Sequence, residues 1–121
     1  MTGYVANIET ETLQNENFRK VLFTGPKCQL VVMTLVPGED IGAEVHEDHD
    51  QFIRIEEGEG KAVIDGEEFD ISDDWAVVIP AGAEHNVINT SATNKMKLYT
   101  IYSPPEHPEN TVHETKEEAV E

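Results

Sequence analysis

From residue 18 to residue 102 the chain alternates short runs of β-branched, aliphatic and aromatic residues with breaks made of Gly, Pro and Asp. The runs are residues 18–24, 29–36, 51–55, 60–64, 67–71, 75–79, 85–89 and 97–102. Short apolar runs at such close spacing are typical of the strands of an all-β sandwich or barrel. We therefore predict one all-β domain over residues 18–103, between a polar N-terminal arm (1–17) that includes a helical turn and a tail (104–121).

The sharpest local signal is the pair Asp65-Gly66, which lies between two of these runs. Both residue types tolerate a positive φ, so the pair predicts a two-residue hairpin turn. The segment Leu-Val-Val-Met at residues 30–33 is apolar on both faces. Since only one face can fill the core, the other needs a second cover, which is either the N-terminal arm or a second subunit. An outward apolar strand is a ready dimer surface, so we expect a homodimer.

Length and charge narrow the class of protein. The 121 residues suffice for one domain with a substantial core. Asp and Glu outnumber Lys and Arg by 25 to 8, giving a formal net charge of −17 at pH 7, and such a surface repels nucleic-acid phosphates and anionic lipids. No segment approaches the roughly 20 apolar residues of a membrane span, and the N-terminus lacks the pattern of a secretion signal. We expect a cytoplasmic protein that binds neither nucleic acid nor membranes, with its single Cys28 buried and inert.

The residues most informative about function lie in the segments 44–51 (Glu-Val-His-Glu-Asp-His-Asp-Gln) and 80–85 (Pro-Ala-Gly-Ala-Glu-His). Glu44 and His46 are two apart, so on a strand they point to the same face. Gln51 opens the next strand-like run, and His85 opens another after a Pro-x-Gly turn. Four oxygen and nitrogen donors can therefore converge from three strands, which is the environment that a divalent metal ion needs.

The spacing of these residues resembles that of the cupins, which are small double-stranded β-helix (jelly-roll) barrels with two sequence motifs. The first motif is Gly, five residues, His-x-His, three or four residues, Glu, six residues and Gly; it is matched by Gly38, Glu44, His46, Gln51 and Gly58. The second is Gly, five residues, Pro-x-Gly, two residues, His, three residues and Asn; it is matched by Pro80, Gly82, His85 and Asn89, with Asp74 in place of the first Gly. The resemblance covers about residues 35–102 and implies a single jelly-roll barrel.

Within this family the chain looks most like the small single-domain proteins described as mannose-6-phosphate-isomerase-like. The resemblance implies one divalent metal ion, with the usual three His and one Glu replaced here by His46, His85, Glu44 and Gln51. This set keeps two imidazoles and one negative charge, so it suits Fe, Mn, Zn or Ni. Without Gln51 it is the two-His-one-carboxylate set that, when facial, serves non-haem Fe(II) oxygenases. Gln51 is then either a direct ligand or a residue that orients one.

The other three histidines, His49, His107 and His113, can be explained as solvent-exposed residues, but each also has a possible functional role. His49 lies in an acidic turn and is expected to be solvated, although the spacing His46-x-x-His49 would let it replace Gln51. His107 and His113 lie in the proline-rich tail, where most histidines are exposed. If the tail folds over a barrel mouth, its own or a partner's, either histidine becomes a candidate catalytic acid or base. We single out His113, and His113→Ala should then keep the metal and abolish turnover.

Other polar and aromatic residues are expected to have structural roles. Asn89 should fix a turn through hydrogen bonds, Trp75 and Tyr99 should pack, and Arg54 should point outward and pair with an acidic neighbour. The segments 111–114 and 115–118 each match a capping box, which predicts a short acidic helix at the C-terminus.

Two classes of function stay open. The first is a metal-dependent enzyme that isomerises, eliminates from or oxidises a small oxygen-rich, sugar-like molecule at an open metal position. The second is a non-catalytic module that holds a metabolite or metal in the same barrel. We favour the enzyme. Phosphate binding needs cationic donors, and only the outward Arg54 lies between the motif ligands, so an uncharged or cation-tolerant substrate is expected.

Overall fold

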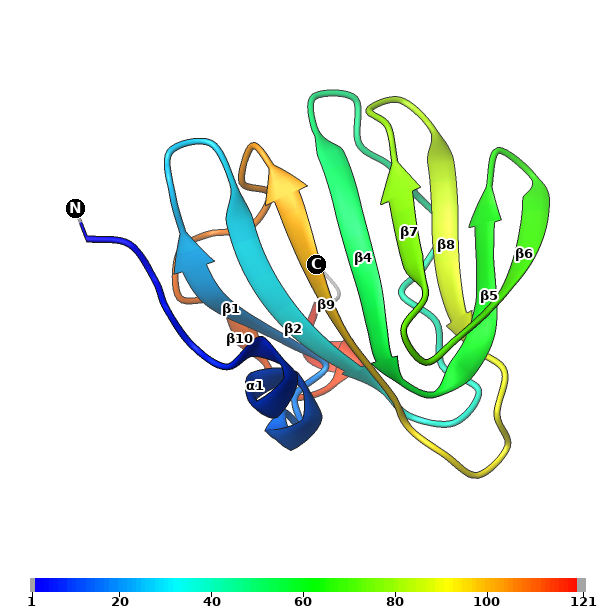
Figure 1. Ribbon diagram of the computed structural model, residues 1–121. Helices are drawn as coiled ribbons and strands as arrows, with labels where there is room; N and C mark the ends of the chain where they lie inside the picture. Colours follow the sequence, from blue (N-terminus) through cyan, green and yellow to red (C-terminus); the bar gives the residue numbers. More distant parts are fainter. Residues whose placement is uncertain (1, 120–121) are drawn as a thin grey trace.

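The computed structural model describes residues 2–119, which form two antiparallel β-sheets (Figure 1). The strands are β1 (Arg19–Thr24), β2 (Gln29–Leu35), β3 (Glu44–Val45), β4 (Asp50–Glu57), β5 (Glu59–Ile64), β6 (Glu67–Ser72), β7 (Ala76–Ile79), β8 (Glu84–Asn89), β9 (Met96–Ser103) and β10 (Val112–His113). A helix, α1 (Ile8–Gln14), precedes them, and a 3-10 helix, η1 (Lys116–Ala119), follows. The all-β jelly-roll barrel predicted from the sequence is confirmed, with its short helical elements at both ends.

The larger sheet has the strand order β10-β1-β2-β9-β4-β7, and the smaller has the order β3-β8-β5-β6. Each of the eight predicted runs forms a strand, with ends that differ by one or two residues. The strands β3 and β10 are not among these runs, because two residues are too few to show an alternating pattern. A strand at β3 was expected only from the spacing of Glu44 and His46, and β10 was not predicted. Both of these short strands lie at sheet edges, and both carry residues of the candidate site.

The hydrophobic core lies between the two sheets. Alternate residues of β2, β4 and β9 point into it and are completely buried, and they include Val31, Met33, Leu35, Ile53, Ile55 and Leu98. Burying each such side chain contributes about 1.5–3 kcal/mol to folding. At one end of the smaller sheet Asp65 and Gly66 have φ values of 49° and 83°, and Ile64 pairs with Glu67 across them. The predicted two-residue hairpin is therefore confirmed.

The N-terminal segment covers part of the outer face of β2. Its helix α1 begins after Asn7, whose side chain accepts a hydrogen bond from Thr10 N (3.0 Å), and it is longer than the predicted single turn. Beyond the helix, Asn15 O accepts hydrogen bonds from Thr34 Oγ1 of β2 (2.7 Å) and from Lys97 Nζ of β9. The arm thus supplies part of the second cover that the apolar strand needs.

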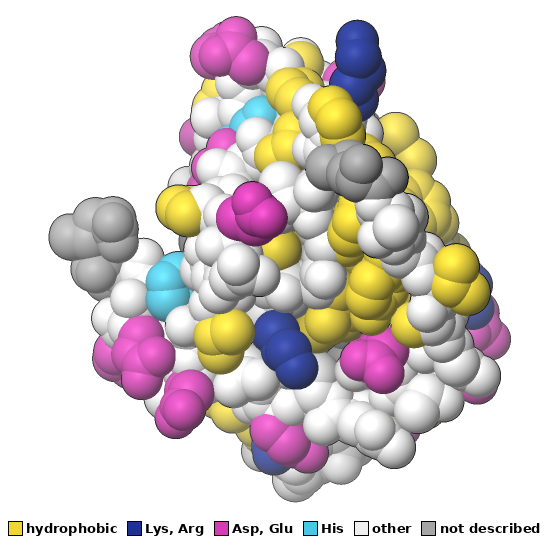
Figure 2. Space-filling view, turned by 90° about the vertical axis from the view of Figure 1, so that its left-hand side faces the viewer, with side chains coloured by type: hydrophobic (Ala, Val, Ile, Leu, Met, Phe, Trp, Pro, Cys, Tyr) yellow, Lys and Arg dark blue, Asp and Glu magenta, His cyan; other side chains and the backbone are white. Residues whose placement is uncertain are grey.

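Apolar side chains still gather in a band on the β1 side of the molecule, where acidic groups are scattered around them (Figure 2). The homodimer therefore stays a prediction. None of the helices within residues 2–119 has the length and apolar character needed to span a membrane.

Two expectations about burial were wrong. Cys28 is exposed, because it lies in the turn between β1 and β2, where its carbonyl accepts a hydrogen bond from Gly25 N (2.8 Å). Trp75 is 53% exposed, because it immediately precedes the edge strand β7. The outward orientation of Arg54 is confirmed, since its guanidinium lies 3.0 Å from Asp74 and 3.2 Å from Glu56.

Asn89, at the end of β8, holds three chain segments together. Its side-chain amide donates hydrogen bonds to Leu35 O (3.0 Å), Val36 O (3.2 Å) and Asn94 O (2.9 Å), and its side-chain oxygen accepts one from Ser91 N (3.0 Å). The residue is 1% exposed, so water cannot replace these bonds. The expected role of Asn89 as a residue that fixes a turn is confirmed.

We predict that Asn89→Ala lowers the free energy of unfolding by about 3 kcal/mol, because it leaves buried carbonyls without donors. The measurement is chemical denaturation of the variant beside Asn94→Ala, which alters an exposed side chain in the same turn. Equal stabilities for the two variants would contradict this role.

Candidate metal centre

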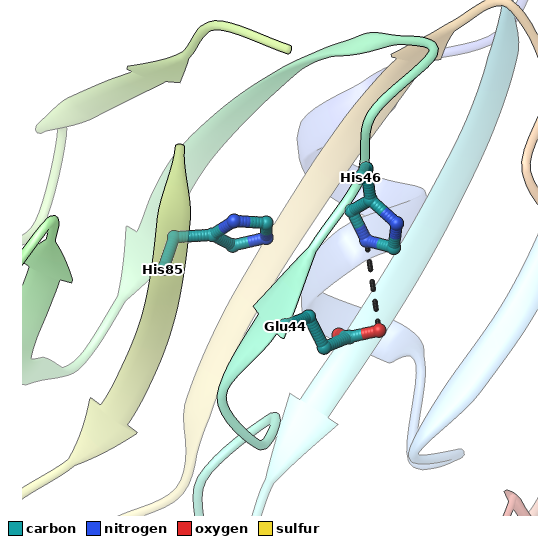
Figure 3. Close-up of side chains that lie close together, drawn as sticks. All are labelled: Glu44, His46 and His85. Carbon is teal, nitrogen blue, oxygen red and sulfur yellow. Dashed lines mark ion pairs between the residues drawn. The ribbon is translucent and has the colours of Figure 1, made fainter. Parts of the chain in front are cut away.

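Strand pairing brings the two halves of the candidate site together. The short strand β3 pairs with β8 so that Glu44 lies directly opposite His85. His46 follows β3, and its carbonyl accepts a hydrogen bond from Gly82 N (2.8 Å), which ties the two motif segments together. The side chains of Glu44, His46 and His85 point toward one another (Figure 3). Each offers one potential ligand atom, and these three atoms all lie within 4.8 Å of one another.

His85 is oriented by its own backbone. The residue is buried, and its Nδ1 lies 3.1 Å from Ala83 O. A carbonyl only accepts hydrogen bonds, so Nδ1 carries the proton and Nε2 keeps its lone pair. Such a contact to a carbonyl is the usual way in which a metal-binding imidazole is held in the ligating tautomer.

A second group of potential ligands shares His46 with the first. It consists of His46, His49 and Glu106, whose potential ligand atoms also lie within 4.8 Å of one another. Glu106 comes from the tail, with one carboxylate oxygen 3.7 Å from His46 Nδ1 and the other 3.3 Å from His49 Nε2. The expectation that His49 is solvated was wrong, because the turn folds inward and the tail closes over it.

The residues present fit a divalent cation. His46 Nε2, His49 Nε2 and Gln51 Oε1 are buried atoms without a hydrogen-bond partner among the described residues. Gln51 Nε2 donates a hydrogen bond to Thr100 Oγ1 (3.0 Å), so the amide oxygen is the atom of this side chain that is left to bind a metal ion. Unpaired buried acceptors are costly, and a metal ion would satisfy them. Coordination by Gln51 stays a prediction.

Burial favours the neutral form of two imidazoles around the site, those of His46 and His107. Burial lowers the pKa of His46, against the opposing effect of the nearby carboxylates of Glu44 and Glu106. Burial, followed by the positive charge of Arg19, lowers the pKa of His107 to about 3. Burial also raises the pKa of Tyr102, which therefore keeps its phenolic proton. Since metal ions bind the neutral form of histidine, these shifts leave His46 ready to coordinate.

A pocket of about 520 Å³ opens beside the two groups. Its polar lining comes from both ends of the chain and includes Arg19, Glu44, Glu106, His107, His113 and Lys116. Although only the outward Arg54 lies between the motif ligands in the sequence, β1 and the tail bring two further cations, Arg19 and Lys116, to this pocket. Lys116 Nζ is paired with Asp40, and the hydrogen bonds from Asn86 and Lys116 lower the pKa of that carboxyl.

The tail does fold over the mouth of the barrel. Gln29 Oε1 accepts hydrogen bonds from the backbone N–H groups of Glu106 (3.2 Å) and His107 (2.9 Å), and the two-residue strand β10 pairs with β1. Tyr102 connects the two regions, since its ring meets those of His46 and His49 edge-on and its hydroxyl lies 3.4 Å from His107 Nε2. The catalytic role of His113 stays a prediction, but the residue lines the pocket as that prediction requires.

A family model described as the Cupin domain matches residues 31–102, more than half of the chain. The chain belongs to the cupin family. Among solved structures, a crystal structure of the protein BH2720 from Bacillus halodurans is similar, with a TM-score of 0.94 and 45% sequence identity over 98% of this chain and 93% of that one.

Two curated relatives are also similar along most of this cupin. The uncharacterised protein YrkC of Bacillus subtilis is 51% identical over 97% of the chain and 66% of its own length. The uncharacterised protein L612 of Acanthamoeba polyphaga mimivirus is 49% identical over 87% of the chain and 68% of its own length. The chain thus spans about two thirds of the length of these relatives.

Proposed function

We propose that the protein is a divalent-metal-dependent cupin enzyme of the mannose-6-phosphate-isomerase-like group, which isomerises, eliminates from or oxidises a small oxygen-rich molecule in its barrel. The single observation that carries this proposal is the convergence of Glu44, His46 and His85, beside which buried polar atoms make no hydrogen bond within residues 2–119. His46 Nε2 and His49 Nε2 have only carboxylate oxygens at 3.5 Å and 3.3 Å, and Gln51 Oε1 has no partner there. A purely structural cluster would pair these atoms, because each unpaired one lowers stability by about 1–3 kcal/mol.

The ion would be held by Glu44, His46 and His85, assisted by Gln51. When bound, a divalent ion supplies a Lewis acid that polarises an oxygen atom of the substrate. Glu106 then lies at the edge of the pocket with its carboxylate directed at His46 and His49, where it can accept a proton from the substrate. The phenol of Tyr102 and the neutral imidazole of His107 lie side by side and can hold a substrate hydroxyl.

The tail covers one side of this site. Its anchors are the hydrogen bonds of Gln29 and the pairing of Arg19 with His113 and of Lys20 with Val112. Excluding water strengthens every electrostatic interaction in the pocket, because the local dielectric constant falls. The pocket of about 520 Å³ is partly open to solvent and has the size of a small-molecule site.

We expect the purified protein to contain nearly one Fe, Mn, Ni or Zn ion per chain, and Glu44→Ala and His85→Ala to lose it. Elemental mass spectrometry of the three proteins makes this measurement. Glu106→Ala should keep the ion, because Glu106 belongs only to the second group of ligands. Glu84→Ala, which removes an exposed carboxylate next to His85, is the matched control.

The metal-loaded and metal-stripped proteins should then be compared in isomerase, lyase and dioxygenase screens. Turnover that depends on the metal supports the enzyme. If the protein binds no ion even after reconstitution, the proposal fails and the non-catalytic binding module replaces it. Loss of the ion in Glu106→Ala but not in Glu44→Ala would move the ion to His46, His49 and Glu106.

A further inference from the structure

Arg19 is a buried cation that has no matching carboxylate among residues 2–119. The residue is 7% exposed, and its Nε has no hydrogen-bond partner in this part of the chain. Within residues 2–119 it forms no ion pair, although Asp and Glu residues are three times as numerous as cations in this chain. Its guanidinium carbon lies 5.2 Å from the centre of the Phe18 ring, and this cation–π contact offsets only part of the cost of burying a charge that has no carboxylate beside it. Lys116, the other cation of the pocket, is paired with Asp40 and is therefore neutralised.

The surroundings of Arg19 place this charge inside the pocket. Arg19 begins β1 and lies opposite His113 of β10, and both residues line the pocket that also contains Glu44 and Glu106. Arg19 Nη1 lies 3.3 Å from His113 Nδ1. A guanidinium can only donate, so His113 Nδ1 accepts and the imidazole proton sits on Nε2. Both residues are therefore hydrogen-bond donors at the same end of the pocket.

The balance of charge in the pocket favours a carboxylate over a phosphate. One guanidinium matches the two oxygens of a carboxylate in a bidentate pair. A phosphate dianion would need a second free cation, and it would be repelled by Glu44 and Glu106 in the same pocket. A singly charged carboxylate near Arg19 is repelled less by Glu44 and Glu106 than a phosphate dianion, and it gives the guanidinium an anionic partner.

We propose that Arg19 and His113 form the carboxylate-binding end of the pocket, so that the substrate is a small hydroxy acid whose oxygen atoms reach the metal ligands with its other end. This inference rests on the proposed function for the metal ligands, and it replaces the expectation of an uncharged substrate. In this arrangement His113 positions the substrate and orients Arg19.

Nuclear magnetic resonance of the unmodified protein tests the contact directly. The chain has only two arginines, Arg19 and Arg54, so its ¹⁵N spectrum contains two arginine Nε signals, which Arg54→Gln assigns. Glycolate is expected to shift the Arg19 signal in a saturable way, whereas its neutral counterpart glycolamide should not. The Arg54 signal should stay in place. No shift with glycolate overturns the proposal, as does a shift with inorganic phosphate at lower concentration.

Isothermal titration calorimetry measures how much more tightly the carboxylate binds than the neutral amide. We expect glycolate to bind about 10- to 100-fold more tightly than glycolamide, as for a hydrogen bond to a charged group. Arg19→Gln should reduce the ratio of glycolate to glycolamide affinity to about one while the metal content stays unchanged. Arg19→Lys keeps the positive charge but loses the two parallel N–H donors of the guanidinium, so it should give an intermediate ratio. Arg54→Gln, which changes an outward arginine, should leave it unaltered. An unchanged ratio in a folded Arg19→Gln protein overturns the proposal.

The same titrations on metal-stripped protein separate this inference from the proposed function. If no ion binds but glycolate still shifts the Arg19 signal, the proposed enzyme fails and the carboxylate site stands. If the ion binds and supports turnover while acids and amides bind equally well, the carboxylate site fails alone.

Discussion

His46→Ala is expected to abolish metal binding, with a loss in affinity of at least about 100-fold, which exceeds the usual effect of removing a residue that merely orients a ligand. The reason is that His46 belongs to both groups of potential ligands, with Glu44 and His85 on one side and His49 and Glu106 on the other. Whichever group holds the ion, the imidazole of His46 is lost.

The measurement combines elemental analysis with thermal unfolding. A bound ion stabilises the folded state in proportion to the logarithm of its concentration over Kd. A chelator should therefore lower the Tm of the unaltered protein and leave that of His46→Ala unchanged. His113→Ala is the control, because His113 lines the pocket but belongs to neither group of ligands. Retention of a full equivalent of metal by His46→Ala would exclude both groups.

Gly60→Ala is expected to cause the largest loss of stability from a single methyl group, at least about 3 kcal/mol, or on the order of 10 °C in Tm. A Cβ at Gly60 would lie 2.0 Å from Ile88 O and 2.5 Å from Met96 Cε. The methionine side chain can move, but the carbonyl belongs to β8, which pairs with β5 through Gly60 and Asn89. Relief of the clash would separate these two strands.

Differential scanning calorimetry of Gly60→Ala and Gly3→Ala makes the comparison. An added Cβ at Gly3 meets no atom within 4 Å, so this variant should unfold at the temperature of the unaltered protein. A Gly60→Ala protein with the same Tm as Gly3→Ala would show that the two strands can shift apart without cost.

The sequence allowed most of the barrel to be predicted, because its strands are local patterns. The runs of apolar residues and the Asp65-Gly66 turn are read within a few residues of one another, and the structure contains each of them. The opposition of Glu44 and His85 could be anticipated for a similar reason, since both lie at fixed places in two motifs.

The rest of the site depends on contacts between distant parts of the chain. Glu106 meets His49 only because the tail returns across the barrel, and Arg19 meets His113 through a pairing of two residues. Contacts of this kind cannot be predicted from a local sequence pattern. The one signal that pointed to them was the pair of histidines, His107 and His113, in a proline-rich tail that otherwise resembles a linker.

The tail that closes the pocket is built differently from the barrel that holds the candidate metal ligands. Within the described residues, the fully buried core ends at Tyr102, whereas Glu106, His107, His113 and Lys116 reach the pocket from the segment beyond it. His107, His113 and Lys116 belong to neither group of candidate ligands, so substitutions at these three positions can change which molecule is admitted without removing a potential metal ligand. Part of the ligand choice can consequently evolve in the tail of this cupin while the candidate metal ligands of the barrel stay unaltered.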